Sequence, residues 1–113
     1  MSVSIFHNPR CSKSRQTLAL LEEKGITPEI IDYLNNAPSV AELKNLAAML
    51  GLSAREMMRV KEAEYKDQNL KEADEEQLFQ AMHQTPKLIE RPIVIKDGAA
   101  RIGRPPESVL EIL

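Results

Sequence analysis

The sequence contains a single cysteine among its 113 residues, no tryptophan, and only two tyrosines and two phenylalanines. A single thiol excludes an intramolecular disulfide and a cysteine-rich zinc site, so any covalent partner of Cys11 must come from outside the chain. No apolar run approaches the roughly 20 residues that cross a bilayer, and no basic segment followed by an apolar stretch marks a secretory leader. A reducing, cytoplasmic location is therefore the expectation.

Neither sign of charge predominates, because the sequence has fifteen Lys and Arg and seventeen Asp and Glu, for a formal net charge of -2. This balance does not favour a nucleic-acid partner. The 42% hydrophobic and 28% charged residues are typical of one small globular domain, which we expect to span residues 1–113. A domain of this size buries roughly two-thirds of its unfolded surface, so it needs no metal or disulfide to fold.

Hydrophobic periodicity, helix caps and turn residues predict the order β, α, β, a helical block, and then β, β, α. Strands are predicted over residues 2–6, 29–34, 88–95 and 99–102. Helices are predicted over residues 12–24, 39–50, 74–83 and 107–113, together with a short helix that begins at Ser53 and carries Met57, Met58 and Arg59. Residues 61–73 have no clear pattern, and Val109, Leu110 and Leu113 are expected to face inward.

Two capping boxes and one turn support these elements. Ser39 is followed by Glu42, and Ser53 by Glu56, at the spacing of a capping box. The Asp97-Gly98 pair is typical of a β-hairpin turn, which joins antiparallel strands, whereas a crossover helix joins parallel ones. The expectation is an α/β fold with a mixed four-stranded sheet. By analogy this is the thioredoxin-like fold with a helical insertion at about residues 39–84.

Cys11 lies between the first predicted strand and the first predicted helix. Unpaired N–H groups and the helix dipole favour an anion there, and the nearby His7, Arg10, Lys13 and Arg15 would lower the pKa of the thiol further. The pattern indicates a thiolate, while a buried apolar cysteine remains the alternative.

The residues after the cysteine exclude two mechanisms. The sequence Cys11-Ser12-Lys13-Ser14 is C-x-x-S, which lacks the second sulfur of a dithiol enzyme, and a phosphatase loop would need arginine in place of Thr17. What remains is a nucleophile that forms a covalent adduct, which an external thiol releases. The hydroxyl of Ser14 and the charge of Arg15 are expected to support the thiolate.

Arginines next to prolines provide a candidate anion site. Arg91 precedes Pro92 and Arg104 precedes Pro105 at the adjoining ends of the predicted hairpin, and paired guanidinium groups suit a tetrahedral oxyanion. Arg59, considered by itself, favours a solvated helix face. His7 is open to proton transfer or to ordering the loop, and the spacing of the histidines and the cysteine predicts no metal site.

Residues 7–15, 88–94 and 101–105, taken with Met57-Met58-Arg59, resemble the glutaredoxin-coupled arsenate reductase family, and its short members most closely. The resemblance covers essentially the whole chain. It implies a thioredoxin-like fold and a cytoplasmic oxidoreductase of arsenic detoxification.

The resemblance also implies a role for particular residues. Cys11 matches the nucleophile that forms a covalent adduct with arsenate, and His7 matches a histidine that helps to hold the thiolate. The oxyanion-binding positions are matched by Arg59, Arg91 and Arg104, which replaces the solvated-face interpretation of Arg59. Pro92 matches the cis-proline beside the active site.

The implied partners are arsenate, glutathione as co-substrate, and glutaredoxin. Glutathione attacks the adduct, glutaredoxin reduces the mixed disulfide, and arsenite leaves, with no metal or organic cofactor and no nucleic-acid or membrane partner. Two alternatives remain open. One is a thiol enzyme for another substrate, such as glutathionylated proteins. The other is a regulator that binds RNA polymerase, although such proteins typically carry a C-x-x-C pair.

Overall fold

The computed structural model describes residues 2–113, which divide into two compact units. We call them the sheet unit, made of the residues up to Asn36 together with Arg91–Leu113, and the helical unit, Ala37–Glu90. The expectation of one domain with an insertion at residues 39–84 stays a prediction.

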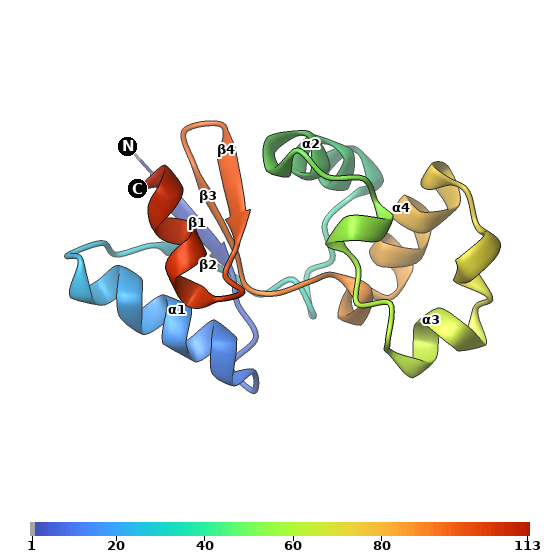
Figure 1. Cartoon of the computed structure of the whole chain (residues 1–113), viewed down its shortest axis with the longest axis horizontal. Helices are drawn as coiled ribbons and strands as arrows, with labels where there is room; N and C mark the ends of the chain where they lie inside the picture. The colour runs from blue at the N-terminus through green and yellow to red at the C-terminus, as the bar shows by residue number, and fades with distance from the viewer. Residues whose placement is uncertain (1) are drawn as a thin grey trace. The chain divides into compact units, whose positions relative to one another are not determined.

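The sheet unit contains a mixed four-stranded sheet in the order β2-β1-β3-β4 (Figure 1). The strands are β1 (Val3–Phe6), β2 (Glu29–Ile31), β3 (Ile93–Lys96) and β4 (Ala99–Ile102). Strand β1 is parallel to β2 and antiparallel to β3, which is in turn antiparallel to β4. The predicted mixed sheet is confirmed.

A hydrophobic cluster of the sheet unit lies on one face of this sheet. Ile5 of β1 lies directly opposite Val94 of β3, and residues opposite each other on neighbouring strands have their side chains on the same face of the sheet. They pack there with Leu21 of α1 (Ser12–Glu23) and Val109 of the 3-10 helix η4 (Pro106–Ile112). Figure 1 shows α1 and η4 next to each other, and the two helices are in contact. The predicted first helix is confirmed.

Strand β2 ends at Ile31, so the prediction that it continues to residue 34 is wrong. The carbonyl of Asp32 accepts the N–H group of Asn36 at 2.9 Å, which turns the chain. Tyr33 is thereby buried, with its ring stacked on that of Phe6 at a centroid distance of 5.7 Å. Tyr33, which contributed to the prediction of a longer strand, is therefore present because its aromatic ring is buried and not because the strand continues.

The C-terminal hairpin is shorter than predicted. Strand β3 begins at Ile93, because Pro92 has no N–H group to donate to a neighbouring strand, and residues 86–88 form the 3-10 helix η3 (Pro86–Leu88). Asp97 and Gly98 have φ angles of 51° and 82°, which confirms the tight hairpin turn.

The C-terminal helix η4 is a 3-10 helix, and the prediction that Leu110 faces inward is wrong. Val109 is fully buried, but Leu110 is 38% exposed. The tighter winding of a 3-10 helix, with three residues per turn, moves Leu110 away from the face that α-helical spacing would give it.

The helical unit is built from short helices. They are α2 (Val40–Leu50), η1 (Arg55–Met57), α3 (Ala63–Asp67), η2 (Leu70–Glu72), α4 (Glu75–Gln84) and η3. The Ser39 capping box is confirmed, because Ser39 Oγ accepts the N–H of Glu42 at 3.1 Å and Glu42 Oε1 accepts the N–H of Ser39 at 2.9 Å. Helices α2 and α4 pack against each other. Among residues 2–113, no helix has both the length and the apolar character that crossing a membrane requires.

The predicted helix from Ser53 is wrong beyond its first turn. Its capping box forms, but the helix ends at Met57 after a single 3-10 turn. Met58 instead forms an isolated β-bridge with Ile89, and the N–H of Arg59 donates to the carbonyl one residue before Ile89 at 2.7 Å. This pairing between distant segments takes the backbone away from the helix, so Arg59 lies in a loop.

Arg55 orders the segment 61–73, for which the sequence shows no clear pattern. Its guanidinium group donates to the hydroxyl of Tyr65 and to the carbonyls of Leu70 and Ala73, the latter two at 3.1 and 3.0 Å. A planar group with five donors satisfies three acceptors from different turns at once. The segment is therefore held by a tertiary contact rather than by local propensity.

Candidate active site

Cys11 is the N-cap residue of α1, where the chain changes from an extended to a helical backbone. The loop before it is closed by hydrogen bonds, from the N–H of Cys11 to the carbonyl of Asn8 at 3.0 Å and from the N–H of Arg10 to the Asn8 side chain at 3.0 Å. Arg15 donates through Nη1 to the carbonyl of Pro9 at 2.8 Å. These contacts place the sulfur at the positive end of the helix.

The Cys11 side chain is buried, with 9% of its surface exposed, but its surroundings are polar. Burial by itself would raise the pKa of the thiol. It is outweighed by the backbone N–H groups of Ser14 and Lys13 and by the charges of Arg91 and Arg104, so the pKa lies below its ordinary value. Nη2 of Arg104 lies 3.7 Å from Sγ. The burial of this cysteine is therefore not that of an apolar core residue.

Arg91 and Arg104 come together at the base of the hairpin, as expected from their places at the adjoining ends of β3 and β4. Arg104 Nε donates to the carbonyl of Arg91 at 2.9 Å. The N–H of Gly103 donates to the carbonyl of Pro92 at 2.9 Å, and the Arg91-Pro92 and Arg104-Pro105 bonds are both cis. Arg91 and Arg104 thus lie at the same end of the sheet as Cys11, and the positive charges of both act on its thiol.

His7 is buried and linked to Ser14, with Nδ1 2.6 Å from Ser14 Oγ. Ser14 Oγ also accepts the N–H of Asn8 at 3.0 Å, so this hydroxyl joins the loop to the helix, while the backbone N–H of Ser14 bonds the sulfur. Burial, and then the charge of Arg15, lower the pKa of His7 below its ordinary value, so the ring is neutral at neutral pH. A neutral ring beside Ser14 is suited to ordering this loop.

Seven of the eight predicted site residues lie in the sheet unit: His7, Cys11, Ser14, Arg15, Arg91, Pro92 and Arg104. The eighth, Arg59, belongs to the helical unit, where it forms an ion pair with Glu62. Its role in oxyanion binding stays a prediction. Within residues 2–113, no three His, Cys, Asp or Glu side chains are gathered as metal ligands.

Gly103 is not among the predicted site residues, but it sets the spacing between α1 and the arginine-proline pairs. A Cβ atom at this position would lie 2.6 Å from Oγ1 of Thr17 and 2.8 Å from Cγ of Pro92. The signal was present, because one of only four glycines in the chain directly precedes Arg104.

We expect Gly103→Ala to destabilise the protein by about 1–3 kcal/mol, the usual cost of forcing a methyl group into a packed site. It should also change the pH at which Cys11 reacts, because Arg104 is the next residue and its Nη2 lies 3.7 Å from the sulfur. Urea unfolding and alkylation by iodoacetamide at several pH values measure the two effects. Thr17→Ala in the same chain removes the nearest clash and should restore part of the stability; no recovery would contradict this packing argument.

The lowered pKa of Cys11 predicts that the thiol reacts at a lower pH in the folded protein than in the unfolded one. Alkylation by iodoacetamide should rise with pH at a lower midpoint in buffer than in urea, because only the thiolate reacts. By linkage, the same shift stabilises the fold above the pKa of the unfolded thiol, and this stabilisation is lost as pH falls through the folded pKa. Equal midpoints would show that the sulfur is not activated.

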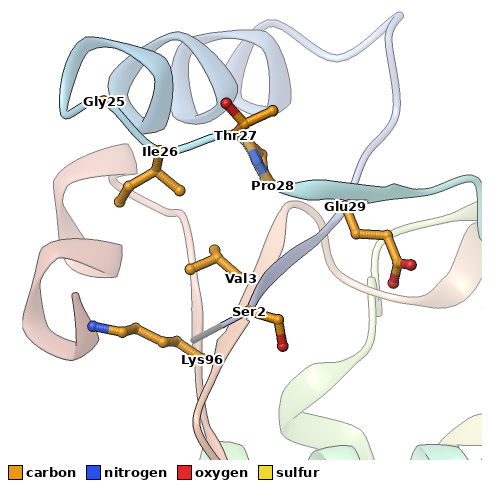
Figure 2. Close-up of a pocket in the computed structure, with 8 residues that line it drawn as sticks. All are labelled: Ser2, Val3, Gly25, Ile26, Thr27, Pro28, Glu29 and Lys96. Carbon is orange, nitrogen blue, oxygen red and sulfur yellow. The ribbon is translucent and has the colours of Figure 1, made fainter.

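A separate pocket of about 600 Å³ lies at the opposite end of the sheet unit, where β1 begins and β3 ends (Figure 2). Figure 2 shows Ile26 and Val3 facing each other, with Lys96 and Glu29 on opposite sides. Since Cys11 follows the far end of β1, this pocket is distinct from the cysteine site.

Comparisons with known proteins agree with this fold. The sequence model of the ArsC family matches residues 6–112. An Escherichia coli protein described as uncharacterized is 57% identical over 98% of this chain and 96% of its own length. An arsenate reductase of Haemophilus influenzae is 56% identical over 100% of both chains. The structure of an arsenate reductase from Vibrio cholerae matches with a TM-score of 0.97 and 60% identity, over 100% of this chain and 98% of that one. With its thioredoxin-like α/β fold and a match over nearly its full length, the chain belongs to the ArsC family.

Proposed function

We propose that the protein is an arsenate reductase that uses glutathione and glutaredoxin and acts through a covalent adduct on Cys11. The observation that carries the proposal is the thiol of Cys11 at the start of α1, with a lowered pKa and with Arg104 3.7 Å away. The relatives named arsenate reductase support the choice of substrate.

The first step is nucleophilic attack by the Cys11 thiolate on the arsenic atom. A sulfur–arsenic bond forms, an arsenic–oxygen bond breaks, and the released oxygen takes up protons and leaves as water. Arg91 and Arg104 bind the remaining oxygens, and Arg59 is proposed as the third arginine. Fixed guanidinium groups stabilise the charge that builds up on these oxygens, since they need no reorganisation during the reaction.

The second step needs a thiol from outside, because the chain has one cysteine. The glutathione thiolate attacks the Cys11 sulfur, and the electron pair of the sulfur–arsenic bond passes to arsenic, which leaves as arsenite. Two sulfurs are oxidised to a mixed disulfide while As(V) gains two electrons. A glutaredoxin thiolate then takes the glutathionyl group and releases the Cys11 thiolate.

This cycle requires no metal or organic cofactor, because glutathione supplies the electrons. It requires a compartment where glutathione is reduced, so we place the protein in the cytoplasm. A neutral His7 hydrogen-bonded to Ser14 is proposed to keep the loop before the nucleophile in place.

An assay of NADPH oxidation tests this function. With arsenate, glutathione, glutathione reductase and glutaredoxin, NADPH should be consumed, and replacing the last three by thioredoxin and thioredoxin reductase should stop turnover. Equal rates with both systems would contradict glutaredoxin dependence. Faster turnover of a glutathionylated protein than of arsenate would favour the alternative thiol enzyme.

A further inference from the structure

Arg59 is embedded in a cluster of four charged side chains in the helical unit, which we call the Arg59 cluster: Arg59, Glu62, Glu64 and Lys87. Arg59 forms an ion pair through Nη2 with Oε1 of Glu62. Lys87 Nζ lies 3.6 Å from Oε2 of Glu62 and 3.3 Å from Oε2 of Glu64. Two cations thus share two carboxylates, and Glu62 lies between the two cations.

The backbone around Arg59 is held on both sides, so only its side chain is available to change partner. The N–H of Arg59 donates to the carbonyl of Leu88 at 2.7 Å, and its carbonyl accepts the N–H of Glu62 at 3.1 Å. The side chains of Arg59 and Glu62 are 22% and 19% exposed, so water screens their interaction only in part.

The carboxylate of Glu62 offers Arg59 what an oxyanion offers, namely negatively charged oxygens within reach of the guanidinium nitrogens. An anion that binds the same guanidinium group must either replace this carboxylate or lie beside it and be repelled. Lys87 lowers the free-energy cost of replacing Glu62 by an anion, because Glu62 keeps a cationic partner when it leaves Arg59.

We propose that Glu62 is an internal competitor for the oxyanion at Arg59 and that Lys87 accepts Glu62 when the oxyanion binds. The inference rests on the proposed role of Arg59 in arsenate binding. Glu62 then sets the substrate affinity through Arg59, as a positioning residue that does not touch the substrate. Arsenate binding is an exchange of ion pairs rather than the filling of a ready site.

The test is the KM for arsenate in the coupled assay. Glu62→Gln removes the competing charge with little change of shape. KM should therefore fall about fivefold, the factor by which one ordinary ion pair changes a binding constant, and kcat should not rise. Glu62→Asp keeps the charge and should keep a KM near that of the unaltered protein. Glu76→Gln removes the same charge from an exposed pair with Lys44 in the same unit and should leave KM unchanged.

Lys87→Met provides the second arm. Without Lys87, Glu62 has Arg59 as its remaining partner, so KM should rise, and the rise should vanish when Glu62→Gln is present in the same chain. An unchanged or higher KM in Glu62→Gln would overturn the inference and show that the carboxylate orients Arg59 for binding.

Arg59→Ala separates this inference from the proposed function. If Arg59→Ala raises the KM for arsenate while Glu62→Gln does not lower it, the competitor role is wrong and Arg59 still binds substrate. If Arg59→Ala leaves KM unchanged, Arg59 does not bind arsenate, and the inference fails together with that part of the proposed function.

Discussion

Cys11→Ser is expected to lower arsenate turnover by about four orders of magnitude or more, as removal of a nucleophile does in other covalent enzymes. A hydroxyl group at this position is not ionised by the contacts that lower the pKa of the thiol. The coupled NADPH assay measures the loss. Because the chain has no other cysteine, residual turnover could not come from a second sulfur.

The fold should survive this substitution, which makes the result interpretable. Serine is among the preferred N-cap residues, and position 11 is the N-cap of α1. Urea unfolding should therefore show stability equal to or slightly above that of the unaltered protein. Mass spectrometry after incubation with oxidised glutathione should find the glutathionyl adduct only on the protein with Cys11. Normal turnover by a folded serine variant would remove the covalent mechanism.

Arg104→Ala has the second largest expected effect, a rise in the KM for arsenate of about 10- to 100-fold. Hydrogen bonds to charged groups contribute about 1.5–3 kcal/mol each, and 1.4 kcal/mol corresponds to a factor of ten. The substitution also removes the cation 3.7 Å from the sulfur, so the pKa of Cys11 should rise and alkylation should shift to higher pH.

Two variants control for the loss of charge. Arg101→Ala removes the same charge from the same strand region, where Arg101 pairs with Glu111 at 2.9 Å, and should leave KM unchanged. Arg104→Lys keeps the charge but not the planar fork, so it should lie between Arg104→Ala and the unaltered protein. An Arg104→Ala protein with normal KM would show that the oxyanion binds elsewhere.

Local interactions made much of the fold predictable. The Ser39 capping box and the Asp97-Gly98 turn each depend on residues within three or four positions, and both form as expected. The prediction of a helix from Ser53 is wrong because a long-range contact decides the structure there. Met58 pairs with Ile89, 31 residues along the chain, and this pairing replaces the helix after one turn.

Some features of the candidate site could likewise be predicted from the sequence, and others could not. The position of Cys11 before a helix, and the arginine-proline pairs at the ends of a hairpin, are visible in the sequence. Three features are not: the fit of Gly103 against Thr17, the link from His7 to the Ser14 hydroxyl, and the ion pair of Arg59 with Glu62. Each depends on side chains meeting in space or on a local loop geometry that residue types do not encode.

By itself, the sequence determined that any covalent partner of its one cysteine must come from outside the chain, that this cysteine lies at a helix start among cations, and that a mixed sheet carries it. These follow from counting, from spacing and from the backbone dipole of a helix. Only the tertiary structure decided that the buried cysteine has polar neighbours and that Arg104 contacts both the carbonyl of Arg91 and the sulfur of Cys11. Burial and these contacts depend on distances between segments far apart in the chain, and such distances exist only after packing.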